Sequence, residues 1–300
     1  MAEKTKFHVS YEYPDGDIVL RTSDDVCFRV HSIILRLASS FFRQMLDIPR
    51  SLSESPADAI PLSEPSNVIA CLFDLVYPTA DGEAADGSPR LPKIRSFEFA
   101  WAVTNAADKY EMPRALAAVR AIVMNSEYLR AQPLELYALA SRWKWTEEAR
   151  VASTATLSAA LLRIQNFEVL RSLDADSLCK LLELHTKRKD AILRFFDLKH
   201  RESKNFIVYQ WECGCSTDLD GTKTEAFMRQ WEAMRCHVIA SLDASPLGEE
   251  LRESTFWSRK DFKLWSFACH NCGKVILNKN YFVKRIGDVF QSASLPTCVE

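Results

Sequence analysis

The sequence predicts an α+β protein in which a small sheet flanked by helices comes first, an all-helical middle segment follows, and a small cysteine-containing α+β module ends the chain. Three observations predict this order. Two β-rich runs surround a polar turn near the N-terminus, apolar residues recur at steps of three and four from Ser32 to about Phe196, and two cysteine pairs lie beyond residue 200. The 300 residues, 47% of them hydrophobic, are enough for about two domains of ~100 to 200 residues.

The positive and negative charges of the chain are nearly equal in number, which argues against nucleic acid as the partner. Lysines and arginines number 38 against 40 aspartates and glutamates, so no overall field draws the chain to nucleic acid. Neither the N-terminus nor any later segment has the apolar run of a signal peptide or of a membrane span of ~20 residues. We therefore expect an intracellular protein, in the nucleus or the cytoplasm, whose partners are other proteins and not nucleic acid, a membrane or a small-molecule substrate.

The first third of the chain carries the β-rich runs. Asp17 to Arg21 and Val26 to Val30 lie on either side of a polar turn, which is typical of a hairpin. From Ser32 the apolar residues, Ile33 and Leu37 among them, change to helical spacing, and a break around Ser39-Ser40 predicts two helices. A loop over 49–56, a short strand over 59–62, a helix ending at Tyr77-Pro78 and a loop over 78–92 complete this part.

Helical spacing dominates the middle of the chain. The apolar faces predict helices over about 99–110, 116–123, 133–142, 146–162 and 174–196. Pro113 and Pro133 suit the first turn of a helix, and Thr146 is expected to cap the helix that Glu147 and Glu148 begin. Beyond residue 200, β-like runs over 206–211 and 263–268 lie on either side of an amphipathic helix over 227–242.

Short motifs along residues 1–125 follow one another in a fixed order. They are Asp17 at the first strand, Phe28-Arg29-Val30-His31, Ile34-Leu35, Ser39-Ser40-Phe41-Phe42-Arg43-Gln44-Met45, Ile60-Pro61-Leu62, Leu75-Val76-Tyr77-Pro78 and Ala106-Ala107-Asp108-Lys109-Tyr110-Glu111-Met112. Each motif alone is a weak signal, but together and in this order they resemble the BTB/POZ domain. The resemblance implies a core shared by Val19, Phe28, Ile34, Leu75 and Val103.

The resemblance continues past residue 125. Pro133-Leu134-Glu135-Leu136-Tyr137-Ala138-Leu139-Ala140 and Trp145-Thr146-Glu147-Glu148-Ala149-Arg150 are similar to the helical extension of fungal BTB proteins. We therefore divide the chain into a BTB/POZ-like domain over 1–125, a helical extension over 126–200 and a C-terminal cysteine-pair module over 201–300.

The BTB/POZ resemblance implies a function in protein interaction. In that family the fold is a docking platform that dimerises or recruits partners, so we expect a non-enzymatic scaffold or adaptor that forms a homodimer or docks another protein. Two alternatives stay open. A substrate adaptor of a cullin-type ubiquitin ligase would need a hydrophobic-x-Glu step, whose nearest match is Leu52-Ser53-Glu54 in a predicted loop. A transcription-linked regulator would contact nucleic acid through the cysteine module.

Two cysteine pairs among the nine cysteines are candidate metal ligands. Cys213 and Cys215 are spaced C-x-C, Cys269 and Cys272 are spaced C-x-x-C, and each pair follows a β-like run. Gly273-Lys274 after the second pair is typical of zinc-ribbon knuckles, and four thiolates satisfy tetrahedral Zn²⁺. The spacing predicts one structural zinc, with reduced cysteines that hold no metal as the alternative.

No catalytic motif accompanies these cysteines. The chain has no G-x-S-x-G, H-E-x-x-H, G-x-G-x-x-G or Walker sequence. A thioredoxin-type pair at Cys269 and Cys272 would need a helix starting there, whereas Gly273 to Leu277 is expected to be a strand. Asp17 and His31 are interpreted as structural residues at a strand-to-helix junction. We therefore expect no enzymatic activity, no catalytic residues and no cofactor other than zinc.

Overall fold

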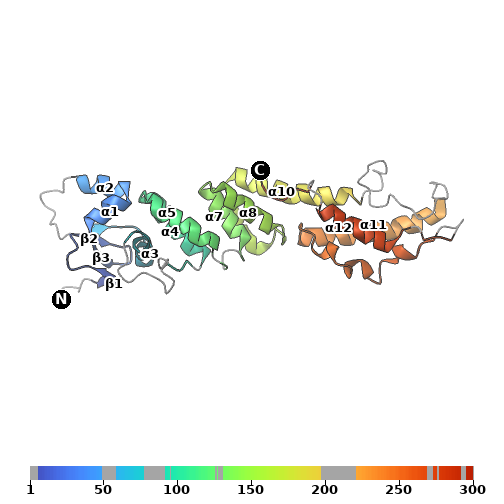
Figure 1. Cartoon of the computed structure of the whole chain (residues 1–300), viewed down its shortest axis with the longest axis horizontal. Coiled ribbons are helices and arrows are strands. Elements are labelled where there is room, and N and C mark those ends of the chain that lie inside the picture. The colour runs from blue at the N-terminus through green and yellow to red at the C-terminus, as the bar shows by residue number, and fades with distance from the viewer. Residues whose placement is uncertain are drawn as a thin grey trace. The chain divides into compact units, whose positions relative to one another are not determined.

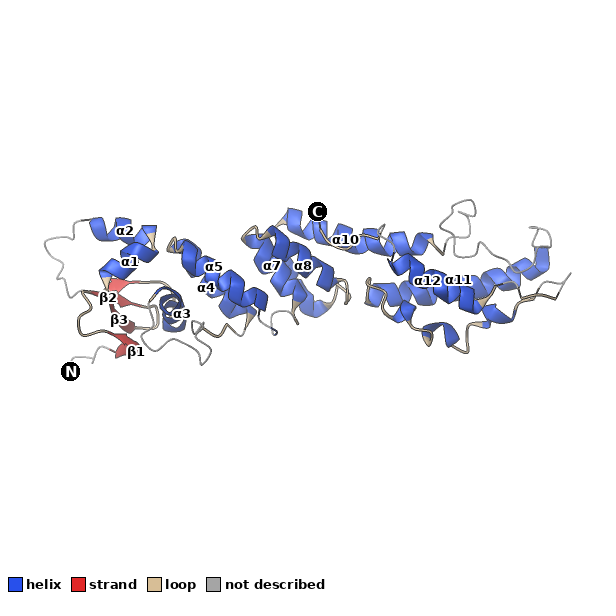
Figure 2. Cartoon of the chain, viewed as in Figure 1, coloured by secondary structure: helices blue, strands red, loops and turns tan. Residues whose placement is uncertain are grey.

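The computed structural model of the chain describes residues 6–48, 59–77, 92–94, 96–125, 127, 131–196, 221–268, 273–275, 277–291 and 295–299. Over these residues the chain is a mixed α and β protein, with a small four-stranded sheet near the N-terminus and many helices (Figures 1 and 2). Its backbone contacts divide it into two compact units, Met1–Leu136 and Tyr137–Glu300. The predicted α+β class is confirmed, and the finer division into three parts stays a prediction.

The sheet belongs to the first unit and has the strand order β1-β3-β2-β4. Its strands are β1 (Lys6–Glu12), β2 (Ile18–Arg21), β3 (Val26–Val30) and β4 (Ile60–Pro61). β2 and β3 form the predicted antiparallel hairpin, with Ile18 opposite Val30. β4 pairs with β2 in parallel. β1 pairs with β3 in parallel, with an irregular register between Phe7 and Glu12, and this strand is not among the predicted ones.

The core of the first unit differs from the predicted one by small shifts along each element. Phe28 and Val103 are fully buried, as expected, whereas Val19, Ile34 and Leu75 are only half-buried. The buried positions beside them are Ile18, Leu20, Leu35, Leu72 and Phe73. Because side chains alternate across a strand, a shift of one residue exchanges its two faces. The correction to Val19 therefore reverses the predicted inward face of β2.

Five helices complete the described part of the first unit up to residue 125. They are α1 (Ser32–Ala38), α2 (Ser40–Asp47), α3 (Ser66–Val76), α4 (Phe97–Lys109) and α5 (Pro113–Asn125). The predicted break at Ser39 is confirmed, since this residue ends α1 and caps α2, and its hydroxyl accepts a hydrogen bond from the N–H of Phe42 at 2.9 Å. Asp24, in the turn between β2 and β3, accepts from the N–H of Ser66 at 2.9 Å and so fixes the start of α3.

The end of α4 closes the first unit against α2. Tyr110 is buried, and its ring stacks on Phe42 with centroids 5.1 Å apart. The Ser39 hydroxyl donates to the Tyr110 carbonyl at 2.5 Å. The Tyr110 hydroxyl donates to Glu64, which also pairs with Lys109 at 2.7 Å. These contacts join residues more than 40 positions apart, so they hold the tertiary arrangement rather than any one helix.

The described part of the second unit contains no strand longer than a single bridge. Its elements, beginning with the helix that contains the unit boundary, are α7 (Pro133–Arg142), α8 (Thr146–Thr156), η1 (Ile164–Asn166), α9 (Phe167–Ser172), α10 (Ala175–Arg194), α11 (Gly221–Ala244), η3 (Glu250–Arg252), η4 (Phe256–Ser258), η5 (Lys263–Ser266) and α12 (Lys279–Gln291). Asp174 caps α10 by accepting from the N–H of Ser177 at 2.9 Å.

Four local expectations for this unit are wrong. α8 ends at Thr156 and not at Leu162, because the chain turns there while Leu157 and Leu161 stay buried. Its cap position is Trp145, and Thr146 is already the first helical residue. Most of the β-like run over 263–268 is the 3-10 helix η5, and one antiparallel bridge between Ala268 and Val275 stands in place of the strand expected at 273–277. The predicted run over 206–211, the predicted loop over 49–56 and all but the last residue of the predicted loop over 78–92 lie outside the described residues.

Aromatic side chains form much of the core of the second unit. Trp231 and Trp257 are fully buried, and the Trp257 ring meets Phe282 edge to face with centroids 5.1 Å apart. Each buried indole finds a backbone acceptor, as buried Trp side chains require. Trp231 donates to the Phe196 carbonyl at 3.1 Å and Trp257 to the Leu251 carbonyl at 2.8 Å. The core thereby joins the end of α10 to α11, the 3-10 turns and α12.

A buried arginine of α10 forms hydrogen bonds to the last described segment of the chain. Arg188 is 2% exposed, and its guanidinium donates to the carbonyls of Pro246 at 2.9 Å and Pro296 at 2.7 Å. Close to this point the N–H of Val299 donates to the Ser153 hydroxyl of α8 at 3.1 Å. His185, one turn before Arg188, lies 3.0 Å from the Thr156 hydroxyl. Neutral dipoles therefore satisfy both buried basic side chains.

Candidate interaction surfaces

The predicted metal ligands cannot be placed. All four predicted ligands, Cys213, Cys215, Cys269 and Cys272, lie outside the described residues. The structure therefore does not test whether they meet at one site. The residues that are described contain no group of three or more His, Cys, Asp or Glu side chains that could hold a metal ion. The structural zinc therefore stays a prediction from spacing.

Asp17 and His31 serve the start of α1. Asp17 accepts from the N–H of Ser32 at 2.7 Å and from its hydroxyl at 2.5 Å. Desolvation acts to raise the pKa of Asp17, but these hydrogen bonds outweigh it and lower the pKa below its ordinary value. The N–H of His31 donates to the Tyr77 hydroxyl at 2.8 Å, and its ring lies 3.3 Å from Asp15. The geometry agrees with the structural role expected for Asp17 and His31.

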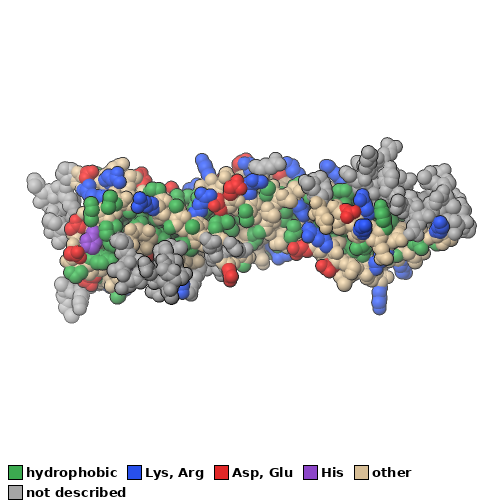
Figure 3. Space-filling view, viewed as in Figure 1, with side chains coloured by type: hydrophobic (Ala, Val, Ile, Leu, Met, Phe, Trp, Pro, Cys, Tyr) green, Lys and Arg blue, Asp and Glu red, His purple; other side chains and the backbone are tan. Residues whose placement is uncertain are grey.

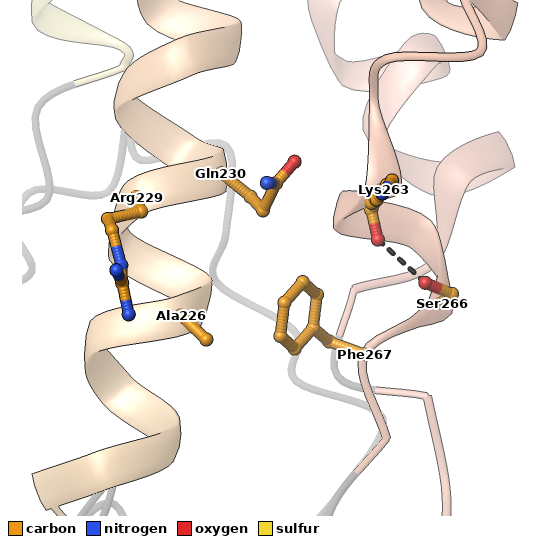
Figure 4. Close-up of a pocket in the computed structure, with 6 residues that line it drawn as sticks. All are labelled: Ala226, Arg229, Gln230, Lys263, Ser266 and Phe267. Atoms are coloured by element: carbon orange, nitrogen blue, oxygen red, sulfur yellow. Dashed lines mark hydrogen bonds between the residues drawn. The ribbon is translucent and has the colours of Figure 1, made fainter.

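A hollow of about 410 Å³ lies between α11 and η5 (Figure 4). Gln230 and Phe267 point into it, while Arg229 lies along the side of α11. Arg229 is paired with Glu225 at 3.8 Å, and the Ser266 hydroxyl donates to the Lys263 carbonyl at 2.8 Å. The lining offers an aromatic ring, an amide and cations, but its two cations do not converge on one point. It is suited to weak polar contacts and carries no nucleophile paired with a base.

A second hollow, of about 380 Å³, lies beside β1 and α3 and is lined by His8 and Asp74 among others. The Tyr11 hydroxyl donates to Asp74 at 2.5 Å. Burial, and then this hydrogen bond, raise the pKa of Tyr11 above its ordinary value. Desolvation lowers the pKa of His8, although Asp74 partly opposes it. Tyr11 therefore stays protonated and acts as a structural donor to Asp74.

The outer side of α1 exposes large apolar side chains. Ile33 is 61% exposed and Leu37 is 73% exposed, and their spacing of four residues places them on one stripe of the helix. Ile48, at the end of α2, is 67% exposed. Arg36 joins the two helices by donating to the Leu46 carbonyl at 2.9 Å and pairing with Asp47. We call Ile33, Leu37 and Ile48 the α1 surface.

The α1 surface corrects an expectation. The helical spacing after Ser32 assigned Ile33 and Leu37 to the apolar face of an amphipathic helix, but Leu35 is the buried residue of α1, and Ile33 and Leu37 face outward. The signal that could have indicated this is that α1 is apolar on more than one side, so that one side must lack a partner within the unit. In the space-filling view, hydrophobic side chains reach the surface of the first unit among charged ones (Figure 3). The first unit therefore carries exposed apolar area on an ordered helix.

Comparisons with known proteins identify no relative of this chain. A scan against protein-family models and a search of curated proteins both find no match to this chain. Among the described residues, no helix combines the length and the apolar composition needed to cross a bilayer. The function is therefore proposed from the chain's own residues.

Proposed function

We propose that this chain is a non-enzymatic protein-interaction scaffold or adaptor, located in the nucleus or the cytoplasm. It acts through a BTB/POZ-like domain of the fungal type with a helical extension, which self-associates or docks a partner protein. The order of the motifs over residues 1–125 supports this proposal, as does a small sheet accompanied by helices in the first unit. The observation that carries it is the exposed α1 surface.

The energetics of the α1 surface favour an interaction. Fully burying an isoleucine or leucine side chain stabilises a protein by ~1.5–3 kcal/mol. Ile33, Leu37 and Ile48 each keep more than half of their surface in water, so covering all three would contribute several kcal/mol, on the order of 3–5. Arg36 already fixes the geometry of α1 and α2, which reduces the ordering that binding requires. Contiguous exposed apolar side chains mark protein contact sites, and Ile33 and Leu37 are contiguous because they are one turn apart on α1.

The test is the molar mass of the whole chain in solution, measured by light scattering over a range of concentrations up to tens of micromolar. We expect a dimer, and we expect Leu37→Asp with Ile33→Asp to shift the chain to monomer. Val9→Asp is the matched control, because Val9 is 98% exposed on β1 and lies outside the α1 surface. A wild-type chain that stays monomeric at every concentration would refute self-association. A dimer that persists when both Ile33 and Leu37 are changed to aspartate would refute the role of this surface.

The zinc prediction belongs to the same proposal as a structural element of the cysteine-pair module. Cys213, Cys215, Cys269 and Cys272 would hold one Zn²⁺ as thiolates, and the metal would supply folding free energy to residues 201–300. Elemental analysis of the purified chain is expected to give about one zinc per molecule. The double change Cys269→Ser with Cys272→Ser should remove it, whereas Cys179→Ser on α10 should not. Metal-free wild-type protein, purified without chelator, would refute the site.

A further inference from the structure

The segment between α8 and α10 exposes a second group of apolar side chains. Leu162 is 68% exposed, Ile164 is 87% exposed and Phe167 is 40% exposed. η1 runs directly into α9, and side chains three residues apart in a 3-10 turn lie one above the other. Ile164 and Phe167 therefore share one side of the segment, and Arg171 follows one α-helical turn later on that side.

A neighbouring side of the same segment is already buried. Leu161 and Leu170 are each 6% exposed, and they supply the apolar face that attaches a short surface helix to its unit. Leu162 and Ile164 keep most of their surface outside that core. The segment therefore keeps apolar side chains uncovered beside its buried face, and these offer contact area that its own unit does not use.

The exposed side chains stand on an ordered backbone. The Asn166 side-chain amide donates to the Leu161 carbonyl at 2.8 Å, and the Asn166 N–H donates to the Arg163 carbonyl at 2.9 Å. The turn is also joined to the residues after α11, because the N–H of Leu247 donates to the Leu157 carbonyl at 2.8 Å. The exposure of Ile164 is thus a property of a fixed turn, and a partner would meet a preformed surface.

The charges beside these apolar residues indicate what kind of partner fits. Arg163 and Arg171 are exposed, and within the described residues neither makes an ion pair. Glu168 is the one carboxylate between residues 161 and 173. Arginine beside apolar side chains is enriched at protein interfaces, and its guanidinium pairs with carboxylates in a two-pronged geometry.

We infer that Leu162, Arg163, Ile164, Phe167 and Arg171, here called the η1–α9 surface, form a docking site for a protein segment that presents apolar side chains flanked by carboxylates. The complementary charge of the two arginines favours this occupant over a second copy of the chain or a basic peptide. The η1–α9 surface lies on the second unit and the α1 surface on the first, so each can fail its test independently of the other.

The experiment follows the methyl signals of Leu162 and Ile164 by nuclear magnetic resonance in the whole chain. The probe is a synthetic helical peptide of about 14 residues, with leucines at i, i+3, i+4 and i+7 and glutamates elsewhere. A second peptide replaces every glutamate by lysine. Arg163→Glu with Arg171→Glu reverses the charge of the surface, and Lys260→Glu is the control for a charge change at another exposed position of the second unit.

We expect the glutamate peptide to shift these two methyl signals and the lysine peptide to leave them unchanged. The double arginine change should weaken the glutamate peptide at least about tenfold and make the surface accept the lysine peptide, while Lys260→Glu and the α1 changes should leave binding as it was. Equal responses to both peptides, no response to either, or indifference to the arginine change would overturn the inference. So would signals that shift on concentration without peptide, which would identify a second copy, or that respond only to anionic lipid vesicles.

Discussion

Lowering the pH from about 7 to about 5 should destabilise the second unit through one side chain, His185. This histidine is buried on α10 and contacts the Thr156 hydroxyl at 3.0 Å. Burial lowers its pKa from 6.5 to about 4. Between these two values the unfolded chain takes up a proton that the folded chain does not, so the free energy of unfolding falls as the pH falls through this window.

The size of the effect follows from the two pKa values. The full difference corresponds to about 3 kcal/mol, because each pKa unit is worth ~1.4 kcal/mol. At pH ~7 almost none of this is lost, since both states are mostly neutral, and at pH ~5 about 2 kcal/mol is lost because only the unfolded state is protonated. That is a large share of the ~5–15 kcal/mol by which domains are stable.

The measurement compares the wild-type chain with His185→Gln. Glutamine can still donate to Thr156 but does not titrate, so carboxylates common to both proteins cancel in the difference. Urea unfolding followed by tryptophan fluorescence at about pH 7, 6 and 5 gives the free energy for each. We expect the wild-type advantage to shrink by about 2 kcal/mol from pH 7 to pH 5. Parallel pH profiles for the two proteins would refute the buried, neutral state of His185.

Three further changes test the packing described above. Arg188→Met should cost about 3–5 kcal/mol and speed hydrogen exchange over residues 295–299, because it leaves buried carbonyls without a donor; unchanged exchange there would contradict the fastening role. Gly248→Ala should cost about 2 kcal/mol or more, since φ is +70° and an added Cβ would lie 2.5 Å from the Phe290 ring. In the matched change Gly287→Ala, where nothing lies within 4 Å, thermal unfolding should show a gain of up to about 1 kcal/mol, and equal losses at both glycines would refute the steric argument. Asp24→Ala should cost about 1–2 kcal/mol by uncapping α3, and a neutral result in urea unfolding would show that the cap is dispensable.

Features fixed by neighbouring residues could be predicted from the sequence. The hairpin of β2 and β3, the break at Ser39 and the starts of α5 and α7 at Pro113 and Pro133 are all confirmed. Each depends on turn, cap or proline chemistry that acts within a few residues. These elements therefore needed no knowledge of the tertiary structure.

Features fixed by distant residues could not be predicted. β1 exists because it pairs with β3, and its irregular register disturbs the alternation that marks a strand. Trp265 donates to the Trp257 carbonyl at 3.0 Å, a packing contact that holds η5 in a turn although its residues have β-forming character.

The interaction surfaces show the same limit. The period of α1 indicates a helix, but it does not say which of its apolar sides is covered, so the exposure of Ile33 and Leu37 emerged only from the structure. The predicted helices ended at Leu162 and began again at Asp174, so the turn that carries Ile164 was assigned no element and its outward position was missed. The cysteine spacing remains a prediction, since all four residues lie outside the described part.

The closure of α4 on α2 has a consequence for how the protein is made. The chain is synthesised from its N-terminus, and the partner of Phe42 and Ser39 is Tyr110, 71 positions after Ser39. Until Tyr110 has left the ribosome, α2 lacks this partner, and the apolar side chain of Phe42 stays accessible to chaperones. Slow translation between Pro49 and Tyr110 would prolong that interval, whereas slow translation after Tyr110 would not.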